Sequence, residues 1–170
     1  MNERLEGPSA DTVRRYITET LRGIVAENGV GEGAGDTFFS FCPDGVPRQD
    51  RWTPFATIVT GDTYDSVSGL SEAGAYRLNI GLPKAVYAAR FGTPPTERDA
   101  AGVLGTGYDY AVRNTVMPHP HYASRHWVCV VNPGPETWAD VRELLGEAYR
   151  FAERKYASTA ARQAASEAGE

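Results

Sequence analysis

The sequence is short of the features that mark several large protein classes. Its two cysteines, Cys42 and Cys129, are far apart, and neither belongs to a CxxC or Cys/His spacing that binds structural zinc. Each lies in an apolar run, so we expect buried, reduced thiols. No apolar run approaches the roughly 20 residues of a membrane-spanning helix, and no apolar leader follows MNERLEGPSA. We therefore expect a cytoplasmic protein without a membrane partner.

Positive charge is also in deficit. The 170 residues include 17 Lys and Arg against 22 Asp and Glu, a formal net charge of −5. This balance gives no general attraction for phosphate backbones, so it disfavours a nucleic-acid partner. An apolar fraction of 41% is sufficient for a core in a chain of single-domain length. We predict one domain over residues 1–170, as a monomer or a dimer, with flexible ends at 1–8 and about 158–170.

Motifs for common cofactors and nucleophiles are missing as well. The glycine-rich stretch GVGEGAGD follows a predicted helix and contains no GxxxxGK[ST], so the context of a phosphate-binding loop is absent. There is no GxSxG elbow and no nucleophilic-cysteine signature. We expect neither a bound cofactor nor a resident metal ion.

What the chain does contain is a regular alternation of strand-forming and helix-forming segments. Runs of β-branched and aromatic residues predict strands over 37–42, 55–60, 76–80 and 127–131, with a fifth strand or a loop over 108–116. Helical spacing predicts helices from Ser9 or Asp11 to about Asn28, over 83–91, over 97–103, and from a capping box at Thr137 to about Ala157.

The order of these elements is typical of an α+β fold. The first two strands are expected to form a hairpin with a long tip. The whole is expected to be an antiparallel sheet of about five strands with helices packed against it.

All three histidines lie within eight residues, at His119, His121 and His126. Histidine is the side chain best suited to proton transfer near neutral pH. One interpretation is a metal site, although the flanking prolines and the lack of a paired carboxylate count against it. A second is a pocket in which His and Arg bind or protonate an anionic or carbonyl-containing substrate. A third is a rigid polar loop before the last strand.

A second group of polar residues lies in and around the strand YRLNI. The period of two places Arg77 and Asn79 on one face, which is usually a solvent face but can converge on a site. Lys84 begins the next helix, where the helix dipole disfavours a cation, and this position indicates a role in holding an anion. In the loop GDTYDSVSG, Asp62 and Asp65 fit a turn with side-chain caps better than a cation site.

Several segments resemble the MmcQ/YjbR-like superfamily. YRLNIGLPKAVYAARFG is similar to its strand-then-helix unit, and VMPHPHYASRHWVCVVNPGPETWADVRELLGEAYRFAERK is similar to its Pro/His loop, His-Trp strand entry and terminal helix. GDTFFSF, PFATIVTGDTYD, RLNIG, MPHPHY and WVCVVNP resemble an actinobacterial subgroup of unassigned function. The resemblance implies a two-layer fold like that of secretion chaperones, with the helices packed on one side of the antiparallel sheet, and a DNA-binding role has been suggested for the superfamily.

We therefore predict a small-molecule site between the 117–127 loop and the 76–84 strand–helix unit. The prediction is a small-molecule-binding protein; one hypothesis for its role is a cofactor-free acid–base enzyme, biosynthetic in character, that acts on an anionic or carbonyl-containing metabolite, and the sequence leaves open whether it is an enzyme. The candidate catalytic residues are His119 and His121, and the candidate substrate-binding residues are Arg77, Asn79, Lys84, Tyr64, Tyr122 and Arg125. The alternative is a non-enzymatic module that binds DNA or a protein partner.

Overall fold

The structure is a computed structural model of the chain and describes residues 6–45 and 53–169. Its elements, in chain order, are α1 (Ala10–Thr20), β1 (Ile24–Asn28), η1 (Gly31–Gly33), β2 (Thr37–Phe41), β3 (Ala56–Val59), β4 (Arg77–Gly81), α2 (Lys84–Phe91), β5 (Met117–Pro118), η3 (Ala123–Arg125), β6 (Trp127–Val131) and α3 (Pro135–Ala168). Across these described ranges, no helix is both long enough and apolar enough to span a membrane.

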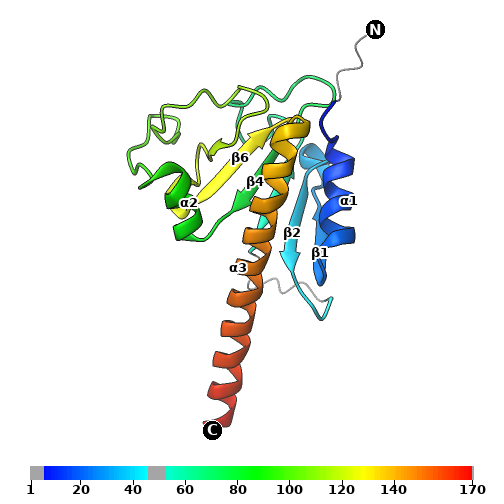
Figure 1. Cartoon of the computed structure of the whole chain (residues 1–170), viewed down its shortest axis with the longest axis vertical. Helices are drawn as coiled ribbons and strands as arrows, with labels where there is room; N and C mark the ends of the chain where they lie inside the picture. The colour runs from blue at the N-terminus through cyan, green and yellow to red at the C-terminus, as the bar shows by residue number, and fades with distance from the viewer. Residues whose placement is uncertain (1–5, 46–52, 170) are drawn as a thin grey trace.

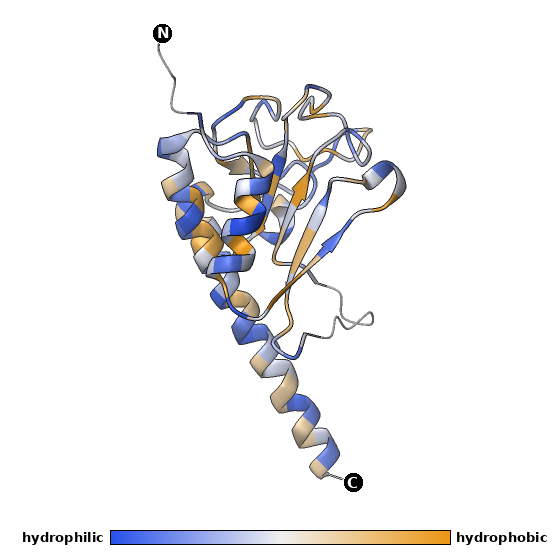
Figure 2. Cartoon of the chain, turned by 90° about the vertical axis from the view of Figure 1, so that its right-hand side faces the viewer, coloured by the Kyte–Doolittle hydropathy of each residue, from blue (hydrophilic) through white to orange (hydrophobic). Residues whose placement is uncertain are grey.

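The strands form one antiparallel sheet of six strands in the order β1-β2-β3-β4-β6-β5. All three α-helices lie against the same face of this sheet, which gives the molecule two layers (Figure 1; Figure 2). The predicted α+β fold class is thereby confirmed. The predicted hairpin is confirmed in the pairing of β2 with β3, while the part of its tip over 46–52 lies outside the described residues.

The main core lies between the sheet and the helices. Leu78 and Ile80 of β4 point to this side and are at most 1% exposed. The predicted apolar stripes of the helices pack against them. The fully buried helical residues of this core are Val13 and Ile17 of α1, Tyr87 of α2, and Val141, Leu144, Leu145 and Ala148 of α3.

The opposite face of the sheet is buried as well, because loops cover it. Leu70 and Ala75 of one loop pack on Val59 and Val131, and residues of the 103–116 loop pack on Met117 and Cys129. Cys129 is buried, as predicted, whereas Cys42 is half-buried, and the two cysteines form no disulfide.

The loops that cover this face of the sheet also bury the polar side chains of β4. Arg77 and Asn79 share that face, as the alternation predicted, but they are only 3% and 4% exposed. The expectation that this face meets solvent is wrong, since loops close over it.

The first predicted helix is wrong in its second half. Ser9 caps α1 by accepting a hydrogen bond from the Thr12 backbone N–H at 3.2 Å, but the helix ends at Thr20. Gly23, with φ of +74°, turns the chain, and Ile24–Asn28 then pairs with β2. The spacing of Ile24 and Val25 fits a helix and a strand equally, and the pairing with β2 selects the strand.

Other local predictions also differ from the structure. Residues 97–103 form no helix, and an antiparallel bridge joins Arg98 to Leu104. α3 begins at Pro135 rather than at a Thr137 capping box, because proline suits the first helical position. It continues to Ala168 instead of ending near residue 157, and it projects beyond the sheet (Figure 1). The alanine-rich sequence of this end explains its helicity.

Candidate functional site

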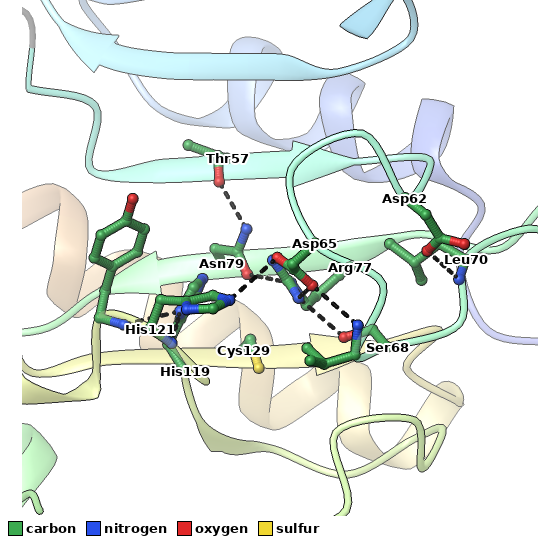
Figure 3. Close-up of polar contacts among 12 residues, drawn as sticks. Thr57, Asp62, Asp65, Ser68, Leu70, Arg77, Asn79, His119, His121 and Cys129 are labelled. Carbon is green, nitrogen blue, oxygen red and sulfur yellow. Dashed lines mark hydrogen bonds and ion pairs between the residues drawn. The ribbon is translucent and has the colours of Figure 1, made fainter. Parts of the chain in front are cut away.

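Arg77 is the centre of a buried polar cluster on the loop-covered face of the sheet (Figure 3). Its guanidinium forms a two-pronged ion pair with the Asp65 carboxylate at 3.0 and 3.1 Å, and it donates to the Ser68 hydroxyl at 2.9 Å. Its Nε donates to Asn79 Oδ1 at 3.0 Å, and Asn79 donates onward to the Thr57 hydroxyl at 2.9 Å. Protein groups therefore occupy four of the five guanidinium donors.

The 61–69 loop is fixed to the sheet through this cluster. Asp62 accepts from the Leu70 N–H at 2.9 Å and Asp65 from the Val67 N–H at 3.3 Å, which confirms the predicted side-chain caps. Burial alone would raise the pKa of the Asp65 carboxyl, but the hydrogen bonds and charge of Arg77 outweigh burial. The pKa is lowered from 3.8, with smaller contributions from His121 and from the Val67 N–H. Asp65 is thus a fixed carboxylate partner for the buried arginine.

His119 and His121 have different environments. His119 is 2% exposed, and its Nδ1 accepts the backbone N–H groups of His121 and Tyr122 at 3.0 and 3.1 Å. Burial, and after it the charges of Arg77 and His121, lower the pKa of His119 well below 6.5. A buried neutral imidazole whose acceptor nitrogen is already used acts here as a cap for the turn that begins at residue 119.

His121 is the more accessible of the two. Its side chain is 24% exposed, and its Nε2 lies 3.7 Å from the Asp65 carboxylate while Nδ1 lies 3.3 Å from the Gly102 carbonyl oxygen. The imidazole thus contacts two loops, and its ring is directed at Asp65 beside Arg77 (Figure 3). Its position beside a carboxylate is compatible with proton transfer, and the acid–base role of His119 or His121 stays a prediction.

The structure brings only some of the predicted site residues together. Arg77, Asn79, His119 and His121 meet in the cluster, and the half-exposed Tyr122 ring lies beside the His119 ring in a tilted arrangement, with centroids 4.9 Å apart. Three predicted residues are elsewhere. Lys84 is exposed at the start of α2, Tyr64 places its hydroxyl over Gly33 of η1, and Arg125 lies at the opposite end of the sheet.

No metal centre forms around the histidines in the described ranges. Across residues 6–45 and 53–169, no three His, Cys, Asp or Glu side chains are arranged to hold a metal ion. Cys129, on the same face as Asn79, is fully buried, and burial raises the pKa of its thiol to about 12, so it is a weak nucleophile and a weak ligand.

A groove opens at the far end of β4, where the strand ends at Gly81. It lies between the second half of α3, the end of β2, residues 53–55 and η3, and has a cavity volume of about 180 Å³. Its aromatic walls are Phe41, Phe55, Trp127, Phe151 and Tyr156.

The Trp127 ring lies directly over Gly81. A β-carbon at position 81 would stand 2.8 Å from that ring, so only glycine admits the ring there. The groove therefore owes its Trp127 wall to the absence of a side chain at the end of β4.

Among the described residues, three charged side chains line the groove. Arg125 and Lys155 contribute cations, and Asp44 contributes an acid. The Lys155 ammonium lies 4.0 Å from the centre of the Phe151 ring, a cation–π contact. Within the described part of the chain, no ion pair involves Arg125 or Lys155. The groove thus combines an apolar lining with two cations that form no ion pair among the described residues.

Sequence reasoning found Arg125 but missed the rest of the groove and part of the polar cluster. Lys155, Phe41 and Trp127 come from three separate elements, and no local spacing links them. Asp65 was recognised only as a turn residue. The signal that could have identified its second role was the arginine twelve positions later in a strand whose other face is fully apolar.

Comparisons with known proteins give one positive result. No curated protein and no solved structure matches the chain. The resemblance to MmcQ/YjbR-like proteins stays a prediction. A sequence profile described as a family of unknown function (DUF6194) matches residues 8–162. Because that match covers nearly the whole chain, the protein belongs to the DUF6194 family.

Proposed function

We propose that the protein binds a small molecule in the groove beneath the second half of α3. The observation that carries this proposal is a cavity of about 180 Å³ in which apolar walls and two cations meet. Concave, mostly apolar sites with a few placed polar groups are the usual form of small-molecule sites.

The position of the groove supports the same proposal. Gly81 and Leu82 belong to the strand–helix unit, and Arg125 and Trp127 belong to the 117–127 segment. These are the two segments between which the sequence predicts a ligand, although the groove is at the Gly81 end of β4 and not at the Arg77 end.

The buried cluster around Arg77 has less support as a binding site. Its guanidinium is already paired with Asp65, and a ligand anion would have to displace a carboxylate held at 3.0 Å. The described residues that line the groove include no histidine, so the groove supports binding more directly than acid–base catalysis.

The proposal is tested by NMR titration with one-ring fragments, among them benzene, indole, benzamide and benzoate. We expect backbone and Trp127 indole shifts to change around Gly81, Trp127 and Ala152. Ala152→Phe places a ring in the groove and is expected to abolish these changes. Ala161→Phe is the matched control, because Ala161 is exposed on the same helix and does not line the groove.

The proposal fails if no fragment perturbs residues of the groove in the wild-type protein. It also fails if Ala152→Phe folds and binds the fragments as the wild type does. The wild-type shift map decides the question by itself if Ala152→Phe does not fold.

A further inference from the structure

We infer that the Lys155 amine is the reactive group of the groove and forms an imine with the carbonyl carbon of an aldehyde or ketone ligand. This inference rests on the proposed function and names the chemical class of its ligand. It is drawn from the position of Lys155, the surroundings of its amine and the scarcity of lysine in the chain.

Lysine is nearly absent from the chain. Of the 17 Lys and Arg residues, only Lys84 and Lys155 are lysines. An arginine guanidinium supplies positive charge but does not lose its proton in a protein, whereas a lysine amine does so when its surroundings disfavour the charge. Lys84 is exposed at the start of α2, and Lys155 lines the groove. The groove therefore contains a titratable amine at a position where an arginine would supply charge alone.

The Lys155 amine lies against an aromatic wall. Its Nζ is 4.0 Å from the centre of the Phe151 ring, and Tyr156 lines the same groove. The residue as a whole is exposed, so a ligand that enters the groove can reach the amine. Across residues 6–45 and 53–169, no carboxylate forms an ion pair with it. The amine is therefore accessible and set against an apolar surface.

These surroundings act on the amine in two ways. The face of the Phe151 ring attracts the ammonium and so holds the side chain over the wall of the groove. Partial burial lowers the pKa of the Lys155 amine from 10.5, because the ammonium loses hydrating water. Desolvation in an apolar pocket is one of the ways in which proteins activate a lysine toward carbonyl substrates. A larger share of the neutral, nucleophilic amine is thus present than in an ordinary lysine.

The reaction balances without an oxidant or a reductant. The neutral nitrogen of Lys155 attacks the carbonyl carbon, a C–N bond forms, and one N–H proton moves to the carbonyl oxygen, which becomes a hydroxyl. The hydroxyl leaves as water with the second N–H proton, and a C=N double bond takes its place. An amine and a carbonyl compound thus give an imine and water, and the reverse reaction releases the ligand.

The walls of the groove favour a carbonyl compound that carries an apolar ring. Phe41 meets the rings of Tyr149 and Tyr156 edge to face, with centroids at 5.6 and 5.4 Å. Aromatic side chains bind a further ring through offset or edge-to-face contacts. Because the Lys155 amine lies on a ring of the same groove, a ligand ring held there brings an adjacent carbonyl carbon to the amine.

The experiment is reductive labelling of the full chain with benzaldehyde and sodium cyanoborohydride, which reduces an imine to a stable secondary amine. Peptide mass spectrometry measures the labelling rates of Lys155 and Lys84, so the second lysine is an internal control. We expect Lys155 to be labelled roughly tenfold faster than Lys84, because the groove holds the aldehyde beside the amine. Benzamide, which carries the same ring but forms no imine, is expected to slow labelling at Lys155 and not at Lys84.

Two pairs of variants locate the reaction. Lys155→Arg keeps the charge and removes the amine, so it is expected to lose the fast labelling, whereas the matched control Lys84→Arg keeps it. Ala152→Phe places a ring in the groove and is expected to reduce labelling at Lys155 to the rate seen at Lys84. Ala161→Phe, outside the groove on the same helix, is expected to leave the Lys155 rate unchanged.

The failures of the two proposals are distinguishable. If fragments perturb the groove in the NMR titration but benzaldehyde labels Lys155 no faster than Lys84, the imine inference is wrong and the proposed function stands. Fast labelling of Lys155 that neither benzamide nor Ala152→Phe slows also overturns the inference, since the reaction would then lie outside the groove. The benzamide competition decides this point if Ala152→Phe does not fold. If no fragment and no aldehyde binds the groove, the proposed function fails, and this inference fails with it.

Discussion

Arg77 begins β4 and Arg125, in η3, lines the groove at the other end of that strand, and the environments of the two arginines differ in nearly every respect. Arg77 is buried and paired with Asp65, Ser68 and Asn79. Arg125 is exposed at the edge of an apolar groove and, among the described residues, takes part in no ion pair. The sequence assigns both the same role of holding a ligand anion. The difference teaches that the partners of a charged side chain, more than its type, separate a residue that holds the fold from one that can hold a ligand.

The largest effect is expected from Arg77→Ala. This change leaves the Asp65 carboxylate buried without its partner, and breaking a buried ion pair in this way costs about 3–5 kcal/mol of unfolding free energy. Urea denaturation of the variant and the wild type measures the loss.

The double variant Arg77→Met/Asp65→Leu sharpens that result. It replaces both charges with apolar groups, so it is expected to lose less stability than Arg77→Ala alone. Equal stability of Arg77→Ala and the wild type would contradict a structural role for the cluster.

Gly81→Ala is expected to act at the groove end of β4. The added β-carbon meets the Trp127 ring at 2.8 Å, and overpacking of this kind costs about 1–3 kcal/mol. Because Trp127 must move, fragment binding in the groove is expected to weaken as well. Calorimetric unfolding and the NMR titration together measure both effects, and an unchanged Trp127 indole shift would count against the packing described.

The pH dependence of stability is expected to report His119. Its pKa in the folded protein is well below 6.5, so between the two values only the unfolded chain takes up a proton at this residue. The free energy of unfolding therefore falls as pH drops below 6.5, by about 1.4 kcal/mol per pH unit from this group.

His119→Asn provides the comparison for this pH effect. Its amide oxygen can accept the two backbone N–H groups in place of Nδ1, but it does not titrate. Urea unfolding from pH 7 to pH 5 is expected to give a flatter slope for the variant. Identical slopes for the two proteins would rule out a buried neutral His119 as the cause.

Arg125→Gln is expected to have the smallest effect on stability. An exposed side chain away from buried networks changes the free energy of unfolding by less than about 0.5 kcal/mol. The two variants together distinguish the cluster from the groove: Arg77→Ala is expected to lose stability, whereas Arg125→Gln is expected to lose ligand binding and keep its stability. A large stability loss in Arg125→Gln would remove that separation.

Much of the fold could be predicted from the sequence, because its strands and helical stripes carry clear periodicities. The alternation in YRLNI placed Arg77 and Asn79 on one face, and WVCVV identified β6 as a buried strand. The prediction for Ile24 and Val25 is wrong because their spacing also fits a helix. Their pairing with β2, a separate segment of the chain, selects the strand. Tertiary context overrode local preference there.

The candidate site was less predictable. The clustering of His119 and His121 in the sequence is real, but burial and backbone hydrogen bonds make His119 a cap, and this depends on contacts that no motif encodes. The groove arises where the end of α3 passes the ends of β2 and β4, so its residues are neighbours only in the folded chain. The sequence predicts Arg125 as a ligand-binding residue, but it does not predict Lys155, the second cation of the groove.

The most direct test of this account is a crystal structure of the protein grown in sodium benzoate. We predict one benzoate in the groove, with its ring against Trp127 and Phe151, while Arg77 keeps its ion pair with Asp65. Benzoate bound at Arg77 in place of Asp65, or a groove that stays without ligand at saturating benzoate, would contradict it.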